Sequence, residues 1–411
     1  MKVAVIGAGS TYTPELVSGL SDVPLDELAL YDIEAARLDV VGGLARRMLR
    51  RQGFGGELEV TGELERALEG ADFVLVQIRV GGQAARLKDE TVPLACGCIG
   101  QETTGAGGFA KAMRTVPVVL ELAEHVRELA APGAWIVDFT NPVGIVTRAL
   151  LDAGHRAVGL CNVAITFQRR IASLLGVDAD RLWVDQVGLN HLTWIRSVWL
   201  DGRDVLGELL DAHGEVLAEE IELPRALLDD LGAIPSYYLR YFYAEGEVLS
   251  ELRAETPRAQ TVAEIERELL AMYRDESLSE KPELLERRGG AFYSQAATEL
   301  VASLSAGRGD VQVVDLRNGG TLPGLEPDDV VEVPARIGRG GPVPVEQRPL
   351  APELLGLVQH VAAYERLTAE AAVTRDRATA RRALLANPLV REYANAEQLL
   401  DALLEHVEAR S

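Results

Sequence analysis

Short apolar runs rich in β-branched residues alternate with longer stretches of helical periodicity over the first 160 residues. The runs that predict strands cover residues 2–6, 28–32, 73–78, 135–139 and 157–160. The stretches that predict helices cover residues 14–20, 33–52, 109–130 and 142–153. Strands and helices that alternate in this way are typical of βαβ units, so the pattern predicts an α/β fold with a Rossmann-like, doubly wound parallel sheet.

The pattern changes after the fifth predicted strand. Residues 181–200 are strand-like and aromatic, and helix-rich stretches follow at 204–231 and 259–287. Glycine and proline clusters over 318–348 predict turns and a surface excursion, with an apolar strand-like piece, VVEVPARI, interleaved at 330–337, and residues 351–410 have helical periodicity. We therefore expect two domains: a Rossmann domain over residues 1–165 and an α+β domain over residues 166–411.

Charge and cysteine content narrow the possible partners. The 41 basic and 63 acidic residues give a net charge of −22, which repels nucleic acid and anionic membranes, so we expect neither as a partner. The N-terminal segment runs directly into a strand pattern without the features of a signal peptide, and three cysteines are too few for a disulfide framework. Both observations indicate a cytoplasmic protein with free thiols.

A glycine pair follows the first predicted strand. Gly7 suits a tight turn and Gly9 suits the close approach of a pyrophosphate to the N-terminus of the next helix, whose start is signalled by Thr-Pro-Glu at 13–15. Tyr12 stands where the motif usually has a third glycine. Asp32 ends the next strand, where an acid binds ribose hydroxyls and repels a 2′-phosphate. The segment predicts an NAD site; a purely structural turn is the alternative.

Polar residues also follow the later strands. Asn141 precedes a proline, which favours an extended backbone that points the amide into a crevice, although it can equally cap the following helix. Cys161 follows the fifth predicted strand, and His191 ends a strand-like run. One cysteine and one histidine are too few for a structural zinc site, but they suit an open site where substrate and water complete the shell of a divalent ion. Taken alone, each is also compatible with an ordinary core residue.

Seven segments, taken in their order along the chain, resemble the NAD- and metal-dependent glycosidases of glycoside hydrolase family 4, and within it the 6-phospho-β-glucosidases. They are GAGSTYTPELV at 7–17, VGGQAARLKDE at 80–90, IGQETTGAGG at 99–108, DFTNPVGIVT at 138–147, GLCNV at 159–163, GLNH at 188–191 and IPSYYLRYFY at 234–243. The resemblance implies a lactate- or malate-dehydrogenase-like arrangement of the two domains. It also implies a homodimer or homotetramer that acts on a small phosphorylated sugar.

The resemblance assigns roles to individual residues. Those that match NAD contacts are Gly7, Gly9, Ser10, Thr11, Asp32, Arg79 and Asn162. Cys161 and His191 match the ligands of a divalent metal, usually Mn²⁺. Those that match substrate contacts are Arg86, Asn141, Asn162 and Arg258. Tyr238 matches the catalytic base, with Tyr241 as a competitor on the same helical face, and Glu102 matches an acid that tunes the tyrosine and takes or relays its proton. Asn162, which follows the metal cysteine, favours a β-linked substrate.

Three positions depart from the family's pattern. Ala164 and Ala106 each replace a usual proline, and we expect them to loosen loops at the metal and cofactor rim. Arg148 stands where glutamate is typical, and we expect it to alter contacts beyond the residues that touch the substrate, which bears on the identity of the substrate.

The implied reaction is a redox-assisted elimination: oxidation at C3 of the sugar, proton removal at C2, loss of the C1 leaving group, addition of water and re-reduction. The alternatives are an NAD-dependent 2-hydroxyacid dehydrogenase and a non-catalytic NAD-binding regulator. The dehydrogenase typically uses an Arg-flanked histidine, and here Arg79 and Arg86 are expected on a loop. The regulator would not require Cys161, His191 and the tyrosines together.

Overall fold

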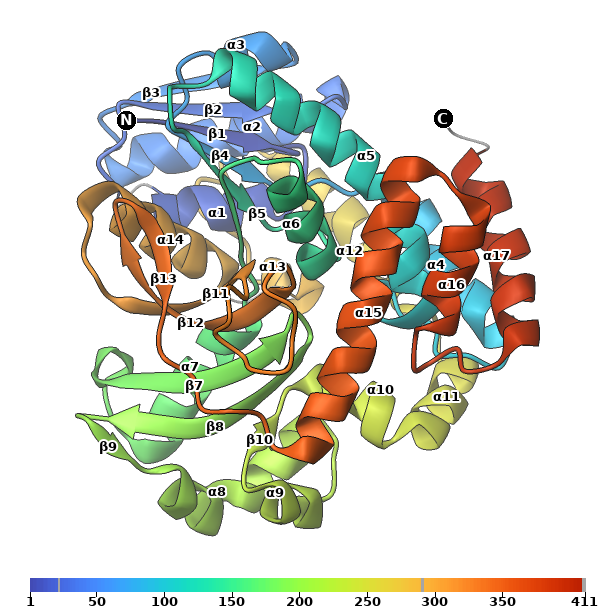
Figure 1. The fold of residues 1–411 in the computed structure, drawn as a ribbon. Helices are drawn as coiled ribbons and strands as arrows, with labels where there is room; N and C mark the ends of the chain where they lie inside the picture. The colour runs from blue at the N-terminus through green and yellow to red at the C-terminus, as the bar shows by residue number, and fades with distance from the viewer. Residues whose placement is uncertain (21–22, 290–291, 409–411) are drawn as a thin grey trace.

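One mixed β-sheet runs through the chain, which in this computed structural model is described for residues 1–20, 23–289 and 292–408 (Figure 1). The strands follow one another across the sheet in the order β3-β2-β1-β4-β5-β6-β11-β12-β7-β8-β10, with β13 beside β12 and β9 beside β8. The parallel half comprises β1 (Lys2–Ile6), β2 (Glu27–Tyr31), β3 (Glu57–Thr61), β4 (Phe73–Val76), β5 (Trp135–Asp138) and β6 (Ala157–Gly159). Its central strands are almost wholly buried, as expected for parallel strands covered on both faces.

The other half of the sheet is antiparallel. It comprises β7 (Leu182–Leu189), β8 (Leu192–Leu200), β9 (Arg203–Asp204), β10 (Ile234–Pro235), β11 (Val311–Arg317), β12 (Val330–Gly338) and β13 (Gly341–Pro344). In Figure 1 the hairpin β7–β8 lies at the lower left, with α8 and α9 below it.

Helices pack around the parallel half in two groups. One group contains α1 (Thr13–Leu20), α2 (Ala35–Gln52) and α14 (Tyr293–Ala306); the other contains α5 (Gly105–Leu129), α6 (Val143–Asp152) and α15 (Pro352–Thr374). The shorter helices α3 (Leu64–Leu68), α4 (Gly82–Ala95) and α7 (Val163–Leu175) complete this part of the chain. The C-terminal helices α16 (Arg377–Leu385) and α17 (Tyr393–Glu408) flank α15 at the right of Figure 1.

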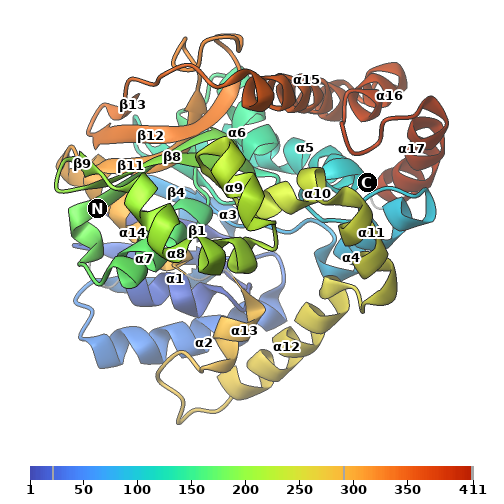
Figure 2. The ribbon, with the colours of Figure 1, turned by 90° about the horizontal axis from the view of Figure 1, so that it is seen from below.

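The remaining helices connect the hairpin β7–β8 to the parallel half. They are η1 (Ala179–Arg181), α8 (Leu206–Ile221), α9 (Arg225–Leu231), η2 (Tyr237–Leu239), α10 (Arg240–Tyr243), α11 (Glu245–Ala254), α12 (Arg258–Tyr273) and α13 (Leu284–Arg288). In the view from below, α12 and α13 lie beside α2 of the parallel half (Figure 2). None of the helices in the described ranges is long and apolar enough to cross a membrane.

The five predicted parallel strands and the four predicted helices of the first part are confirmed to within a few residues. The pattern did not predict β3 or helices α3, α4, α7, α11 and α14. The strand-like piece at 330–337 is confirmed as β12, but β12 is buried between β11 and β7, so the predicted surface position is wrong there. Pro334 argues against a central strand from sequence alone. Pro334 is tolerated because β12 and β7 pair only at Glu332 and Gly188.

Two narrow seams divide the sheet into three blocks. Strands β6 and β11 pair through Gly159 and Asp315, and strands β7 and β12 pair through Gly188 and Glu332. A side chain at either glycine would collide with its surroundings, so each seam depends on the close approach that glycine permits. The sheet and the largest core cluster both continue across residue 165, and the predicted domain boundary there stays a prediction.

Candidate active site

A cavity of about 1670 Å³ opens along the carboxyl ends of the parallel strands, the usual place for ligands in an α/β sheet. It exceeds the ~300–1,000 Å³ typical of a site for one small ligand. Of the residues singled out from sequence, its lining contains Gly7, Gly9, Ser10, Asp32, Arg79, Arg86, Glu102, Asn141, Tyr238, Tyr241 and Arg258. The fold therefore brings the glycine loop and the tyrosines, more than 200 residues apart in sequence, into one space.

The glycine loop and Asp32 form one hydrogen-bonded unit. Gly7 has φ +90°, and a Cβ there would lie 2.8 Å from the carbonyl oxygen of Gln77. The Gly9 N–H donates to Asp32 Oδ2 over 2.7 Å, and a Cβ at Gly9 would lie 2.8 Å from that oxygen. A bare backbone turn ahead of a helix, with an acid at the end of the next strand, fits a dinucleotide with free ribose hydroxyls.

The residues after this loop have different surroundings. Ser10 lines the cavity and accepts a hydrogen bond from the Tyr12 N–H at 3.2 Å. Thr11 is fully buried and is not among the lining residues; its carbonyl accepts from the Tyr273 hydroxyl at 2.7 Å. Thr13 begins α1 as predicted, and its hydroxyl accepts from the side-chain amide of Gln77 at 2.9 Å.

Tyr12 forms part of the cavity wall. Its ring packs edge-on against Tyr293, with centroids 5.9 Å apart, and the Arg288 guanidinium lies 5.5 Å from its centroid. The residue that replaces the third glycine therefore packs against the second half of the chain.

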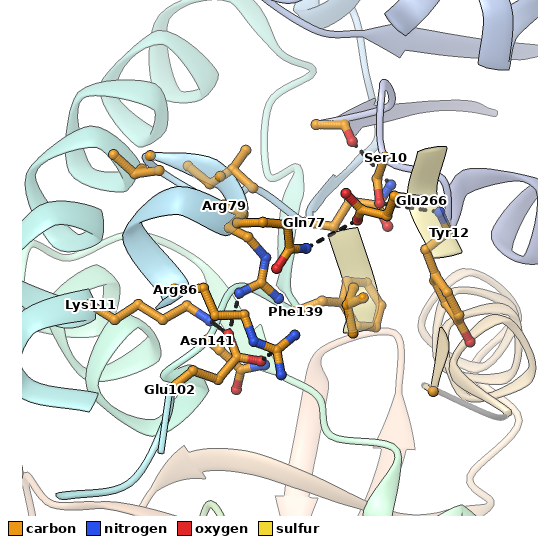
Figure 3. A pocket seen from close by; sticks show the side chains of 18 of the residues that line it. Ser10, Tyr12, Gln77, Arg79, Arg86, Glu102, Lys111, Phe139, Asn141 and Glu266 are labelled. Carbon is orange, nitrogen blue, oxygen red and sulfur yellow. Dashed lines mark hydrogen bonds and ion pairs between the residues drawn. The ribbon is translucent and has the colours of Figure 1, made fainter. Parts of the chain in front are cut away.

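Three cations converge on Glu102 (Figure 3). Its carboxylate pairs with Arg79, with Lys111 at 2.7 Å and with Arg86 at 3.3 Å. These charges hold the pKa of Glu102 well below its usual value despite burial, whereas burial lowers the pKa of Lys111 to about 8. The role of Glu102 in taking or relaying a proton stays a prediction; these three cations favour its charged form.

A second carboxylate, that of Glu90, links the helices that carry the two arginines predicted to contact substrate. Glu90 accepts from Arg86 Nε at 2.6 Å through one oxygen and from the Ala259 N–H at 2.8 Å through the other. Arg86 lies on helix α4, which corrects the expected loop. Arg258 begins helix α12 at the cavity rim, and its guanidinium donates to the carbonyl of Arg287 at 2.9 Å. Glu90 therefore ties α4 to the start of α12.

Tyr238 stacks on His191. Their rings are nearly parallel, at 13°, with centroids 3.8 Å apart, whereas the Tyr241 ring is 6.3 Å from that of Tyr238. Burial raises the pKa of the Tyr238 phenol well above its usual value, and the charges of Cys161, Tyr241 and Glu102 add to the rise. The Tyr238 phenolate is thus a strong base that forms only where positive charge stabilises it. The tuning of Tyr238 by Glu102 stays a prediction.

Cys161 and His191 are both buried; His191 stacks on Tyr238, and Cys161 is near enough to raise the pKa of the Tyr238 phenol. Burial lowers the pKa of His191 to about 3, so its imidazole is neutral and able to bind a metal. Burial raises the pKa of the Cys161 thiol, while hydrogen bonds from Asn190 and from the Val163 backbone oppose that rise.

Within the described ranges, no three His, Cys, Asp or Glu side chains form a group that could hold a metal. One sulfur and one nitrogen donor still fit a divalent ion whose other positions are open to oxygen ligands. Neither Cys161 nor His191 lines the large cavity; His191 instead borders a small neighbouring cavity of about 30 Å³.

The two asparagines differ in position. Asn141 lines the cavity, and its buried Oδ1 has no hydrogen-bond partner, so it can accept a donor from a ligand. Its predicted capping role is wrong, because α6 has Pro142 at its N-cap and no side-chain cap. Asn162 precedes α7, is half-buried and is not among the cavity's lining residues, so its predicted contacts with cofactor and substrate stay a prediction.

Sequence reasoning missed several lining residues. Lys111 is 3% exposed, and Glu266 accepts from Gln83 and Arg288, each at 3.1 Å. A lysine inside the apolar run GGFAKAM is a usable signal, since lysine is almost never fully buried without a partner. Glu266 lies on helix α12 and Arg288 ends the short helix α13, and the pattern offers no comparable signal for either.

The three departures from the family's pattern lie away from the large cavity's lining. Ala106 and Ala164 are buried, each as the second residue of its helix, α5 or α7, and the expected loosening of the adjoining loops stays a prediction. Arg148 is buried on α6 and pairs with Asp329 at 3.0 Å, so its contacts lie away from the cavity lining, and its expected effect on the substrate stays a prediction.

Comparison with known proteins identifies the family. Residues 2–177 match the family described as Family 4 glycosyl hydrolase, and residues 186–390 match its C-terminal domain. The chain is 42% identical to a Bacillus subtilis protein named Probable 6-phospho-beta-glucosidase, over 98% of this chain and 96% of that protein. It is 36% identical to a 6-phospho-beta-glucosidase of Thermotoga maritima, over 98% of each.

Solved structures agree. The 6-phospho-beta glucosidase of Thermotoga maritima with NAD and glucose-6-phosphate has a TM-score of 0.94 and 35% identity, and covers 100% of this chain and 98% of its own. A structure of that protein with manganese, NAD⁺ and glucose-6-phosphate has a TM-score of 0.92. Malate dehydrogenase of Plasmodium falciparum, at 15% identity and a TM-score of 0.57, shares the fold alone. The predicted dehydrogenase-like arrangement is thereby confirmed, the dehydrogenase alternative is not favoured, and the chain belongs to family 4 of the glycosyl hydrolases.

Proposed function

We propose that this chain hydrolyses 6-phospho-β-glucosides with NAD⁺ and a divalent metal ion, manganese, as cofactors. One observation carries the proposal: a single cavity joins the glycine loop and Asp32 to Tyr238, Asn141 and Arg86. The relatives named as β-glucosidases are 35–42% identical to this chain, and those named as α-glucosidases are 27–30% identical. This difference supports the β-linkage.

The residues at the two ends of the cavity have separate tasks. When bound, NAD⁺ supplies a reversible hydride acceptor and the metal ion, held by Cys161 and His191, supplies a Lewis acid. Asp32 accepts the ribose hydroxyls, and its carboxylate repels a 2′-phosphate. The bare backbone at Gly7 and Gly9 admits the pyrophosphate.

At the sugar end, Tyr238 removes the proton from the carbon next to the anomeric carbon. Its buried phenol is a strong base once positive charge favours the phenolate. Asn141 donates to and accepts from sugar hydroxyls through its buried amide. Arg86 and Arg258 hold the phosphate, and Arg258 does so at the N-terminus of a 16-residue helix.

The test is chromophore release from aryl glycosides by purified protein with NAD⁺ and Mn²⁺. We expect release from the 6-phospho-β-glucoside, little from the unphosphorylated β-glucoside or the 6-phospho-α-glucoside, and no net accumulation of NADH. Equal release from the unphosphorylated compound would contradict the phosphate assignment. Stoichiometric NADH formation would favour a dehydrogenase.

We also propose that the enzyme acts in the cytoplasm as a homodimer or homotetramer. The three free cysteines, two of them buried, fit a reducing compartment. Light scattering after size-exclusion chromatography measures the oligomeric state.

A further inference from the structure

A buried carboxylate on the central strand β12 joins two points of the β7–β8 hairpin. Glu332 is 1% exposed and accepts from Gln186 Nε2 at 2.7 Å and from Asn190 Nδ2 at 2.9 Å. The register that pairs Glu332 with Gly188 places the carboxylate between these two amides. Glu332 lines neither described cavity, and the proposed reaction does not use it.

Asn190 connects this carboxylate to both proposed metal ligands. Its side chain hydrogen-bonds the thiol of Cys161, and its backbone is bonded directly to His191. His191 has φ +63°, a left-handed conformation that few residues other than glycine adopt. Such a conformation persists only where the surrounding contacts hold it. The side chain of Asn190 is therefore the point from which the thiol and the hairpin turn are fixed together.

A buried carboxylate that has two neutral amides as hydrogen-bond partners is expensive to retain. An apolar side chain on β12 would avoid the cost of burying the acid. It would also leave both amides without their acceptor, and Asn190 would be free to turn away from Cys161.

We propose that Glu332 is a positioning residue that fixes Asn190 and, through it, sets Cys161 and His191 for a divalent metal ion. The inference rests on the proposed function, which assigns the metal to these two residues. Partners that orient metal ligands from outside the coordination shell typically contribute roughly 10–100-fold to metal affinity. We assign Glu332 a contribution in that range.

Two conservative variants separate position from charge. Glu332→Asp keeps the charge but withdraws the carboxylate by about 1.5 Å, one carbon–carbon bond, so that it no longer reaches both amides. Glu332→Gln removes the charge but keeps an oxygen for Asn190. Its new N–H₂ group can donate to the carbonyl oxygen of Gln186, which has no partner in the described structure, once the Gln186 amide turns over.

The experiment titrates Mn²⁺ into each protein and follows the electron paramagnetic resonance signal of free Mn²⁺. We expect Glu332→Asp to weaken Mn²⁺ binding roughly 10–100-fold and Glu332→Gln to stay within about threefold of the unmodified protein. Asp185→Asn is the control, because it removes another buried carboxylate, one on the β7–β8 hairpin that pairs with Arg196 and is not among the charges that act on Cys161 or His191; we expect little change. NAD affinity and melting temperature, measured on the same samples, report whether each variant is folded.

Mn²⁺ binding by Glu332→Asp within threefold of the unmodified protein would overturn the inference. So would an equal loss in Glu332→Gln, since that would make charge the cause. Failure of the proposed function is distinguishable: if Cys161→Ser binds Mn²⁺ as tightly as the unmodified protein, the metal assignment itself is wrong, whatever the Glu332 variants do.

Discussion

Substitution of Gly9 by alanine tests whether the acid and the glycine loop act as one unit. The added Cβ would lie 2.8 Å from Asp32 Oδ2 and 2.9 Å from its Cγ, whereas ordinary contacts begin near 3.4 Å. The carboxylate must retreat by roughly 0.6 Å, which stretches its 2.7 Å hydrogen bond from the Gly9 N–H toward the limit of a useful bond. The same retreat moves Asp32 away from ribose hydroxyls.

A hydrogen bond to a charged group contributes about 1.5–3 kcal/mol. Loss of one such bond predicts that Gly9→Ala lowers NAD affinity by about 10- to 150-fold. Isothermal titration calorimetry measures this directly. Gly356→Ala is the control: Gly356 lies inside α15 with nothing within 4 Å of an added Cβ, so NAD affinity should not change. An unchanged affinity in Gly9→Ala would refute the coupling between Asp32 and the loop.

Three further predictions follow from the site. Tyr238→Phe should abolish turnover while Tyr241→Phe retains at least about a tenth of it, because only Tyr238 stacks on His191; equal losses in an aryl glycoside assay would contradict this assignment. Glu90→Gln should raise KM for the phosphorylated sugar about tenfold and change kcat less, because either Arg86 Nε or the Ala259 N–H then loses its acceptor. A loss in kcat alone would argue against this role. The pKa of Lys111 is about 8 in the folded protein, against 10.5 for an ordinary lysine. Below pH 8 the charged side chain therefore favours unfolding, and the free energy of unfolding rises by about 3 kcal/mol between pH 8 and 10.5. Lys111→Met should remove that rise in denaturant titrations at several pH values.

The sequence predicted the parallel half of the sheet well, because strands buried on both faces are continuous apolar runs. It missed β3, a five-residue strand with mostly half-buried or exposed positions, and it placed the strand-like residues of β12 at the surface, because Pro334 and the flanking glycines are typical of turns. In the site, single residues with a chemical signature such as Asp32, Arg86 and Asn141 lie in the cavity, whereas Cys161 and His191 lie outside its lining. The partners of Glu102 were not found, because Arg79 and Lys111 meet it only through the tertiary fold. The same holds for Glu332, which is 142 positions from Asn190.

The sheet can open along the two glycine seams. Cys161 lies two residues beyond Gly159, and His191 lies three residues beyond Gly188, so the proposed metal ligands stand where the three blocks of the sheet meet. Backbone amides next to such sparse ladders should exchange with deuterium sooner than those inside the blocks. A metal ion whose ligands lie on both sides of a seam binds only when the seam is closed, and it therefore stabilises the closed state. Amide exchange around residues 159–161 and 186–191 should therefore slow together when Mn²⁺ is added, which makes metal loading readable in the backbone itself.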